Sequence, residues 1–395
     1  MDVFTKCGGE ITQRAEAARA ADLYPFAHEI STRQHSEVIM EGQRTIMLGS
    51  NNYLGLTADD RVIAAARDAL EEFGSGCSGS RHLNGTLTIH NALERELAEF
   101  FGFEDCVTFS TGFQANLGIL SSLCGLHDVI FFDTKNHASL YDAARLSFAR
   151  MKKFAHNDMD ELEQQLKNCK PNRGKLIVVD GVFSMEGDLC NLLKIVELAE
   201  RYNARVMVDD SHGIGTMGTG GRGVGEHFGL YDKIDVLMGT FSKSFASLGG
   251  FMAAPKQVCD FVRYTSRPYI FSASIPPSNV AAVRKALEIM CEEPQLIRQV
   301  NANADYMRKG FARLGIRTTP STAPIIPVEI GADETAFIAS RELLRAGVYI
   351  NPVISPAVED GHSILRTSYT ATLTNEQLDF ALNGFESVFK QLGLI

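Results

Sequence analysis

Apolar runs of strand length alternate with amphipathic segments through the first part of the chain. Residues 129–133, 176–180 and 205–208 are apolar and rich in β-branched side chains, which is typical of buried strands. The segments 89–101 and 193–202 repeat apolar positions at helical spacing, as helices that cover a sheet do. Because strands and helices alternate, the pattern predicts an α/β fold with a mostly parallel sheet and right-handed crossovers.

The pattern changes near residue 280, where longer helical periods replace this alternation. Residues 278–291 and 295–314 are predicted helices, and a strand at 325–330 and a final helix at 375–392 follow. The sequence therefore predicts three parts, which are an N-terminal helical arm at 1–45, a large domain at 46–280 and a smaller α+β domain at 281–395.

Composition narrows the class of protein. The chain has 395 residues, 45% of them hydrophobic, which is enough for a full core. The net charge of −10 argues against nucleic acid or an anionic membrane as the main partner. The eight cysteines form no C-x-x-C pair, which favours reduced thiols in a cytoplasmic protein. No apolar run is long enough for an integral membrane segment, and Met1–Glu10 lacks the apolar core of a signal peptide.

Two predicted strands end in side chains that can carry chemistry. Strand 205–208 runs into Asp209-Asp-Ser-His212, and the apolar run 234–238 leads into G-T-F-S-Lys243-S. Ligands bind at the carboxyl ends of strands in an open α/β sheet. Pyridoxal phosphate (PLP) requires an amine that bonds to its aldehyde and a carboxylate that pairs with its ring nitrogen. Taken separately, each group has a simpler explanation, a solvated lysine and a turn-forming aspartate.

A third strand end predicts an anion site. Ser110–Asn116 follows the apolar run 106–109 and opens a helix with small residues. Free amides and the helix dipole favour a negative charge at such a terminus. We place the phosphate of the cofactor on the amides of Gly112 and Phe113.

The glycine run after His212 formally matches a dinucleotide-binding motif, G-x-G-x-x-G at 213–218. The run continues to Gly225, so no helix begins where a pyrophosphate would need one. The sequence therefore predicts a flexible turn in this place rather than a nicotinamide site.

The motifs V-D-D-S-H-x-x-G and G-T-F-S-K-S together resemble the α-oxoamine synthases, from about Leu23 to the C-terminus. These fold-type I PLP enzymes join an amino acid to an acyl-CoA with loss of carbon dioxide. The resemblance implies the following site residues, with no metal: catalytic Lys243, His137, Asp209 and His212; cofactor-binding Gly112, Phe113, Ser184, Thr240, Ser242, Ser272 and Ala273; and substrate-binding Asn52, Ser80, Arg81 and Arg366.

Five of these residues have more than one possible role. His137 in the D-x-x-x-H-A-S motif would stack on the pyridine ring, whereas a histidine at a helix start is more often a cap. His212 would bond the phenol oxygen of the cofactor or support Asp209. Arg366 would clamp the carboxylate of the amino acid, with a geometry that lysine cannot copy, or form a structural ion pair. Ser80 and its neighbour Arg81 lie in a glycine-rich stretch that could be a surface loop.

The aromatic, proline-rich segment 267–277 would be an inter-domain linker if taken alone. Its family counterpart crosses a dimer interface and brings Ser272 and Ala273 to the cofactor phosphate of the partner subunit. The resemblance therefore implies an obligate homodimer with shared active sites.

Within the family, the lysine motif and R-P-Y-I-F-S-A-S-I-P-P look most like the serine palmitoyltransferases, which make 3-ketosphinganine from L-serine and palmitoyl-CoA. The alternatives are the 8-amino-7-oxononanoate synthases and the 2-amino-3-ketobutyrate CoA ligases. Two more distant alternatives are a fold-type I aminotransferase and a non-catalytic partner subunit. The presence of Lys243 argues against the non-catalytic subunit. Leu373 stands where relatives often carry histidine, so a substrate role at this position is in doubt.

Overall fold

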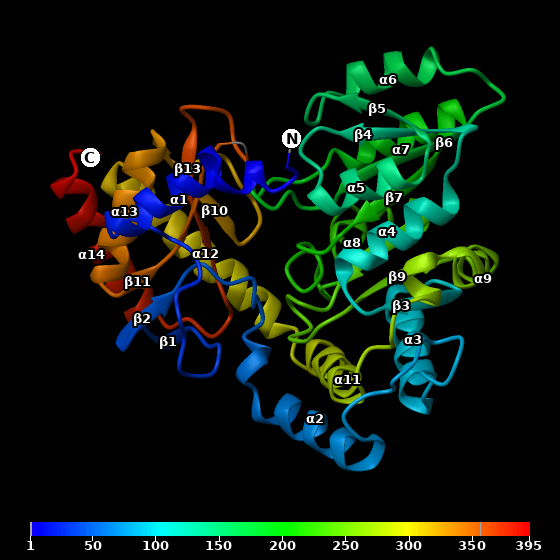
Figure 1. Ribbon diagram of the computed structural model, residues 1–395, viewed down its shortest axis with the longest axis horizontal. Coiled ribbons are helices and arrows are strands. Elements are labelled where there is room, and N and C mark those ends of the chain that lie inside the picture. Colours follow the sequence, from blue (N-terminus) through cyan, green and yellow to red (C-terminus); the bar gives the residue numbers. More distant parts are fainter. Residues whose placement is uncertain (1, 356) are drawn as a thin grey trace.

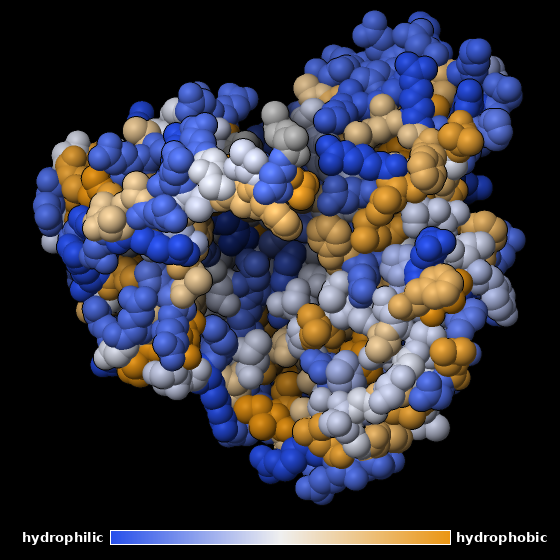
Figure 2. Space-filling model, in the orientation of Figure 1, coloured by the Kyte–Doolittle hydropathy of each residue, from blue (hydrophilic) through white to orange (hydrophobic). Residues whose placement is uncertain are grey.

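The computed structural model describes residues 2–355 and 357–395. Figure 1 shows two lobes, a larger one built around a sheet and a smaller one that contains the C-terminus. Figure 2 shows a hollow between the lobes whose deep surface is hydrophilic.

The larger lobe contains a seven-stranded sheet in the order β3-β9-β8-β7-β6-β4-β5. Strand β9 is antiparallel to both of its neighbours, and the other neighbouring pairs are parallel. This confirms the predicted α/β fold with a mostly parallel sheet. The strands are β3 (Asp105–Phe109), β4 (Asp128–Asp133), β5 (Arg150–Phe154), β6 (Gly174–Asp180), β7 (Arg205–Asp209), β8 (Val236–Thr240) and β9 (Gly250–Ala254).

Helices cover both faces of this sheet, which explains why the central strands are continuous apolar runs. Alternate residues of one strand enter different cores, since successive side chains point to opposite faces. Val206 and Val208 of β7 pack on one side, and Met207 packs on the other. Helices α3 (Thr88–Phe101), α6 (Met159–Lys167), α7 (Leu192–Tyr202) and α11 (Pro277–Glu292) cover the first face, and α4 (Gly112–Leu123), α5 (Ala138–Leu146) and α9 (Lys256–Thr265) cover the second.

The smaller lobe has its own apolar core, between helices and an antiparallel sheet in the order β10-β13-β12. Its elements are α12 (Gln295–Leu314), β10 (Ile325–Gly331), α13 (Asp333–Arg345), β11 (Val348–Tyr349), β12 (Asn351–Val353), β13 (Ser363–Ser368) and α14 (Asn375–Gln391). Leu373 is buried in this core. The apolar segment 348–353 divides between two sheets, since β11 pairs with β2 and β12 pairs with β13.

The N-terminal region departs from the predicted boundaries. Helix α1 (Glu10–Ala20) has no buried residue, but β1 (Glu37–Met40) and β2 (Gln43–Met47) form a hairpin inside the predicted helical arm. Strand β2 pairs in parallel with β11, and Ile46 and Leu48 pack in the core of the smaller lobe. The large domain therefore does not begin at residue 46, because local apolar pattern does not reveal which core a strand joins.

The remaining α-helices of the described residues are α2 (Asp60–Phe73), α8 (Val224–Phe228) and α10 (Arg267–Ile270). Short 3-10 helices lie at Thr5–Gly8, Leu56–Ala58 and Tyr231–Lys233. Asp59 caps α2 through the amide of Arg61, as its position before the helix predicts. None of the helices described is long and apolar enough to cross a membrane.

Candidate active site

Lys243 and Asp209 line the same cavity, which has a volume of about 220 Å³. Asp209 is the last residue of β7, and Lys243 follows the end of the neighbouring strand β8. Because the two strands are parallel, both of their carboxyl ends open on this cavity. His137, His212, Gly112, Phe113, Thr240 and Ser242, all predicted site residues, also line it.

Asn116 and the backbone hold the Asp209 carboxylate. The Nδ2 group of Asn116 donates to Oδ2 at 2.7 Å, and the amide of Ser211 donates to Oδ1 at 3.1 Å. Asn116 also donates to Ser139 Oγ at 2.8 Å, which fixes its side chain. Sequence reasoning missed Asn116, whose one signal was its place a turn after Gly112 on α4.

The Lys243 amine is poised to accept a proton. Burial lowers its pKa to about 7, although the charges of Asp209 and Asp180 oppose this shift. Within residues 2–355 and 357–395 the amine forms no ion pair. A substantial fraction of it is therefore neutral near pH 7, which suits a general base.

A second carboxylate, Asp180, also lines the cavity and was not predicted. It pairs in register with Asp209 across β6 and β7, and the amide of His137 donates to its Oδ1 at 3.3 Å. Burial, and then the negative charge of Asp209, raise the pKa of Asp180 well above its usual range. This shift favours the neutral form of the Asp180 carboxyl group.

His137 is the helix cap that the sequence suggested as its simpler role, and its stacking on the cofactor ring stays a prediction. It is the N-cap of α5, where its Nδ1 lies 2.7 Å from Ser139 Oγ, and its ring lines the cavity. Partial burial lowers its pKa; Asp209 opposes this and Lys243 adds to it. A neutral flat ring can pack against a cofactor ring without adding charge.

His212 is buried and bonded to Tyr53. Its Nδ1 lies 2.7 Å from the Tyr53 hydroxyl. Burial, and then the positive charges of Lys243 and Arg366, lower its pKa well below the usual range. When the hydroxyl donates to Nδ1, the neutral ring carries its proton on Nε2. The recorded partners of Asp209 do not include His212, so its predicted support of Asp209 involves no direct hydrogen bond in the described chain.

The predicted phosphate site contains two backbone amides that have no acceptor among the described residues. Thr111 caps α4 by accepting from the amide of Gln114 at 3.1 Å, and the amides of Gly112 and Phe113 precede it. A Cβ at Gly112 would lie 2.6 Å from Thr240 Oγ1, so only glycine lets the helix approach β8 this closely. Gln114 in turn donates to Ser272 Oγ at 3.1 Å.

Ser272 and Ala273 lie next to the start of α4 in their own chain. Besides the Gln114 contact, the hydroxyl of Ser110 donates to the carbonyl of Ala273. Neither residue is among those that line the cavity. Their predicted approach to the phosphate of a partner subunit stays a prediction.

Arg366 is a buried guanidinium with neutral partners. Its Nε donates to the carbonyl of Ser184 at 2.5 Å, Nη1 to Ser368 Oγ at 3.3 Å and Nη2 to Asn51 Oδ1 at 3.1 Å. In the described part of the chain it forms no ion pair, which argues against the structural ion pair considered above. A buried charge without a counter-ion is costly, so the arrangement suits an anionic ligand.

The asparagine beside this guanidinium is Asn51, whereas the sequence predicted Asn52. The Nδ2 group of Asn52 donates instead to Thr57 Oγ1 at 2.6 Å. The predicted role of Ser184 also changes, because its carbonyl contacts Arg366 and its side chain does not line the cavity.

Arg81 is held by a buried carboxylate and does not line the cavity, so its predicted role in substrate binding stays a prediction. Its Nη1 lies 2.8 Å from Glu94 Oε1, and it also donates to Thr108 and Asn91. Both charged groups are buried. Ser80 is buried as well and does not line the cavity.

The glycine run after His212 wraps a carboxylate instead of forming the predicted flexible turn. Cβ atoms at Gly181, Gly213 and Gly223 would lie 2.3, 1.9 and 1.8 Å from the carboxyl oxygens of Asp210. The amide of Val224 donates to Asp210 Oδ2 at 2.7 Å. Helix α8 begins only at Val224, after the G-x-G-x-x-G motif at 213–218 has ended, so no helix starts where a pyrophosphate would need one.

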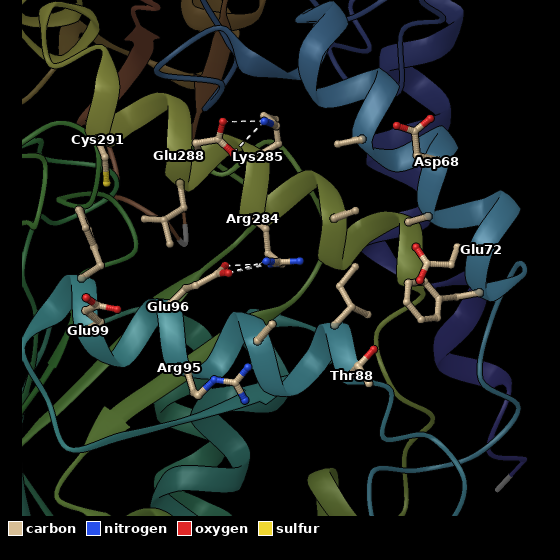
Figure 3. Close-up of a pocket in the computed structure, with 18 residues that line it drawn as sticks. Asp68, Glu72, Thr88, Arg95, Glu96, Glu99, Arg284, Lys285, Glu288 and Cys291 are labelled. Carbon is tan, nitrogen blue, oxygen red and sulfur yellow. Dashed lines mark hydrogen bonds and ion pairs between the residues drawn. The ribbon is translucent and has the colours of Figure 1, made fainter.

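A larger groove of about 880 Å³ lies between α2, α3 and α11, and no predicted site residue lines it. Figure 3 shows two ion pairs among its charged side chains, whereas Asp68, Glu72, Arg95 and Glu99, all exposed, have no drawn partner. Arg284 bonds Glu96 through two nitrogens, and Lys285 bonds Glu288 at 2.6 Å.

Comparison with known proteins agrees with the fold and with the cavity. The model of the class I and II aminotransferases matches residues 43–385. A serine palmitoyltransferase from Sphingobacterium spiritivorum is 46% identical, covering 95% of this chain and 94% of its own. An 8-amino-7-oxononanoate synthase from Bacillus velezensis is 42% identical, covering 93% and 94%. A solved serine palmitoyltransferase variant from S. paucimobilis with bound PLP–myriocin is 36% identical, with a TM-score of 0.97 over 100% of both chains.

The fold is that of a fold-type I PLP-dependent transferase. The chain belongs to the class I and II aminotransferase family and, within it, to the α-oxoamine synthases, which are PLP-dependent acyltransferases. The residues present fit this cofactor. Lys243 supplies an amine, Asp209 a carboxylate and α4 two open amides, and the buried Oδ1 of Asn116 has no partner in the described chain.

Proposed function

We propose that this chain condenses L-serine with palmitoyl-CoA, with loss of carbon dioxide, to give 3-ketosphinganine and CoA. The observation that carries the proposal is that Lys243 and Asp209 line the same cavity. The choice of substrates is supported by relatives named serine palmitoyltransferase at 46% identity.

PLP would be held at both ends of the cavity. Lys243 would bond its aldehyde carbon, Asp209 would pair with its ring nitrogen, and the amides of Gly112 and Phe113 would receive its phosphate. Thr240 and Ser242 offer hydroxyl groups at the same end. When bound, the cofactor supplies an electron sink for the carbanion that forms at the amino-acid Cα.

The protein's own groups then bind the amino acid and move its proton. Arg366 would bind the carboxylate, since its guanidinium has no anionic partner in the described chain. The Nζ atom of Lys243 would remove the Cα proton, because burial keeps its pKa near neutral. His137 would pack over the ring, and neutral His212 would donate from Nε2 to the phenol oxygen.

The second candidate is an 8-amino-7-oxononanoate synthase, which is favoured by relatives of that name at 42% identity. Release of free CoA should be measured with L-serine, L-alanine and glycine, each crossed with acyl-CoAs of several lengths. We expect the fastest release with L-serine and palmitoyl-CoA. Preference for another amino acid and a short acyl chain would overturn the assignment, and transamination without CoA would indicate an aminotransferase.

We also propose that the enzyme is a cytoplasmic homodimer with shared active sites. Large apolar side chains are exposed near the cavity, with Phe271 74% and Phe113 43% accessible. A second copy that covers them would bury the segment carrying Ser272 and Ala273. Sedimentation should give twice the chain mass, and Phe271→Glu should lower it. A monomeric, fully active enzyme would disprove the shared site.

A further inference from the structure

The loop between β6 and α7, residues 181–191, touches both lobes. Its Ser184 carbonyl accepts from Arg366 Nε at 2.5 Å. Its Gly187 carbonyl accepts from Ser321 Oγ at 2.9 Å and from the amide of Ala323 at 3.2 Å. A Cβ at Gly187 would lie 2.5 Å from the carbonyl oxygen of Ile325, so the loop presses closely on the smaller lobe. The place of this loop therefore sets one of the three contacts of Arg366.

A histidine clamp holds the other side of the loop. His156 Nδ1 lies 3.0 Å from Asp133 Oδ1 at the end of β4, and its Nε2 lies 2.9 Å from Asp188 Oδ2 on the loop. The ring also packs edge-on against Phe183 of the loop, with centroids 4.4 Å apart. Since both ring nitrogens face carboxylates, the imidazole carries both protons and a positive charge.

Neighbouring groups support the same attachment. Asn157 donates through Nδ2 to the carbonyl of Leu189 at 3.0 Å and accepts from the amide of Asn191 at 3.0 Å. Lys135 lies 3.0 Å from Glu186. All of these contacts attach the loop to the larger lobe. The loop therefore lies between the histidine clamp on one side and the Arg366 side chain on the other.

We infer that His156 is a positioning residue: by bridging Asp133 and Asp188 it fixes the loop 181–191 so that the Ser184 carbonyl aims Arg366 at the amino-acid carboxylate. This inference rests on the proposed function in that Arg366 binds this carboxylate. His156 does not line the cavity and touches no reacting atom, so it acts only through the loop.

The test uses the PLP-loaded enzyme and the variants His156→Gln and Asp188→Asn. The second variant keeps its shape and removes the charge on the loop side alone. The dissociation constant of L-serine is measured from the absorbance of the bound cofactor, without acyl-CoA, and hydrogen exchange is measured across residues 182–189. We expect both variants to bind L-serine roughly 3- to 30-fold more weakly and to lose protection in the loop, with PLP still retained.

The matched control is Asp105→Asn, which removes a partly buried carboxylate that bonds Arg263 and does not contact the loop. It should lower stability without changing L-serine binding. Unchanged L-serine binding in both clamp variants, an unchanged loop, or equal weakening in the control would each overturn the inference. Glycine and L-alanine are titrated in parallel, so an error about the natural substrates shows in the CoA-release assay and leaves this test intact.

Discussion

The two hollows described above differ in how their charged groups are used. The groove between α2, α3 and α11 is the larger, at about 880 Å³. Its Arg284 and Lys285 form ion pairs with acidic neighbours, and its other charged side chains are exposed to water. The cavity at the strand ends measures about 220 Å³, yet its Lys243 forms no ion pair in the described chain. Arg366, which is buried but does not line this cavity, has only neutral partners. Size therefore does not identify the active site. Charges that the fold buries and leaves unmatched do, because a ligand must balance them.

The largest expected effect comes from removing the unmatched amine. Lys243→Ala should lower turnover by roughly 100- to 10,000-fold, since the base that moves the Cα proton is lost. The circular dichroism spectrum should not change, because the amine stabilises no ion pair in the described chain. Decarboxylative condensation at the wild-type rate, measured as CoA release, would refute the assignment of Lys243.

The second unmatched charge should act on binding. Arg366→Ala should raise the amino-acid KM by an amount equivalent to about 2–3 kcal/mol, because a charge-assisted bond to the carboxylate is lost. Arg366→Lys should recover only part of this, since lysine cannot form the bidentate pair. A KM for L-serine that does not change in steady-state assays would remove Arg366 from the carboxylate site.

The two carboxyl groups at neighbouring strand ends should respond differently to the same change. Asp209→Asn should lower kcat by about 100-fold, because the ring nitrogen loses its anion. Asp180→Asn should change kcat by about threefold or less, since the raised pKa favours a neutral Asp180, which the amide mimics. Equal losses in the two variants would show that Asp180 also acts as an anion.

The His156 clamp should make stability depend on pH. Burial lowers the pKa of His156, but Asp133 and Asp188 outweigh this and raise it to about 10. Because the folded-state pKa exceeds the unfolded value of about 6.5, the clamp's contribution is complete below pH 6.5 and declines as pH rises. It is absent above about pH 10. Urea unfolding should show His156→Gln less stable than wild type at pH 6 and equal to it near pH 10.5.

The smallest effect is expected in the large groove. Arg284→Met removes a partly exposed ion pair with Glu96 and should lower the free energy of unfolding by about 1 kcal/mol or less. The kcat and the KM for both substrates should remain at wild-type values. A loss of activity in this variant would break the distinction between the two hollows.

The sequence by itself determined the elements and the chemistry that are written locally. Asp209 could be found because it directly follows an apolar run, and Lys243 because it lies a few residues beyond the next one. Parallel strands must end at the same edge of a sheet. Gly112 and Phe113 could be found because small residues opened a helix after a third strand. Resemblance to a family then added His137, His212 and Arg366, which no local pattern would have marked.

Only the tertiary structure decided which polar groups meet across long separations. In the folded chain Asn51, not Asn52, bonds Arg366, and Arg81 forms an ion pair with Glu94. The glycine run packs around the Asp210 carboxylate. The tertiary structure also placed Ile46 in the core of the smaller lobe. The physical reason is that a side chain's partner depends on which buried donor or charge lies within about 3 Å in the folded chain, and sequence spacing does not encode that distance.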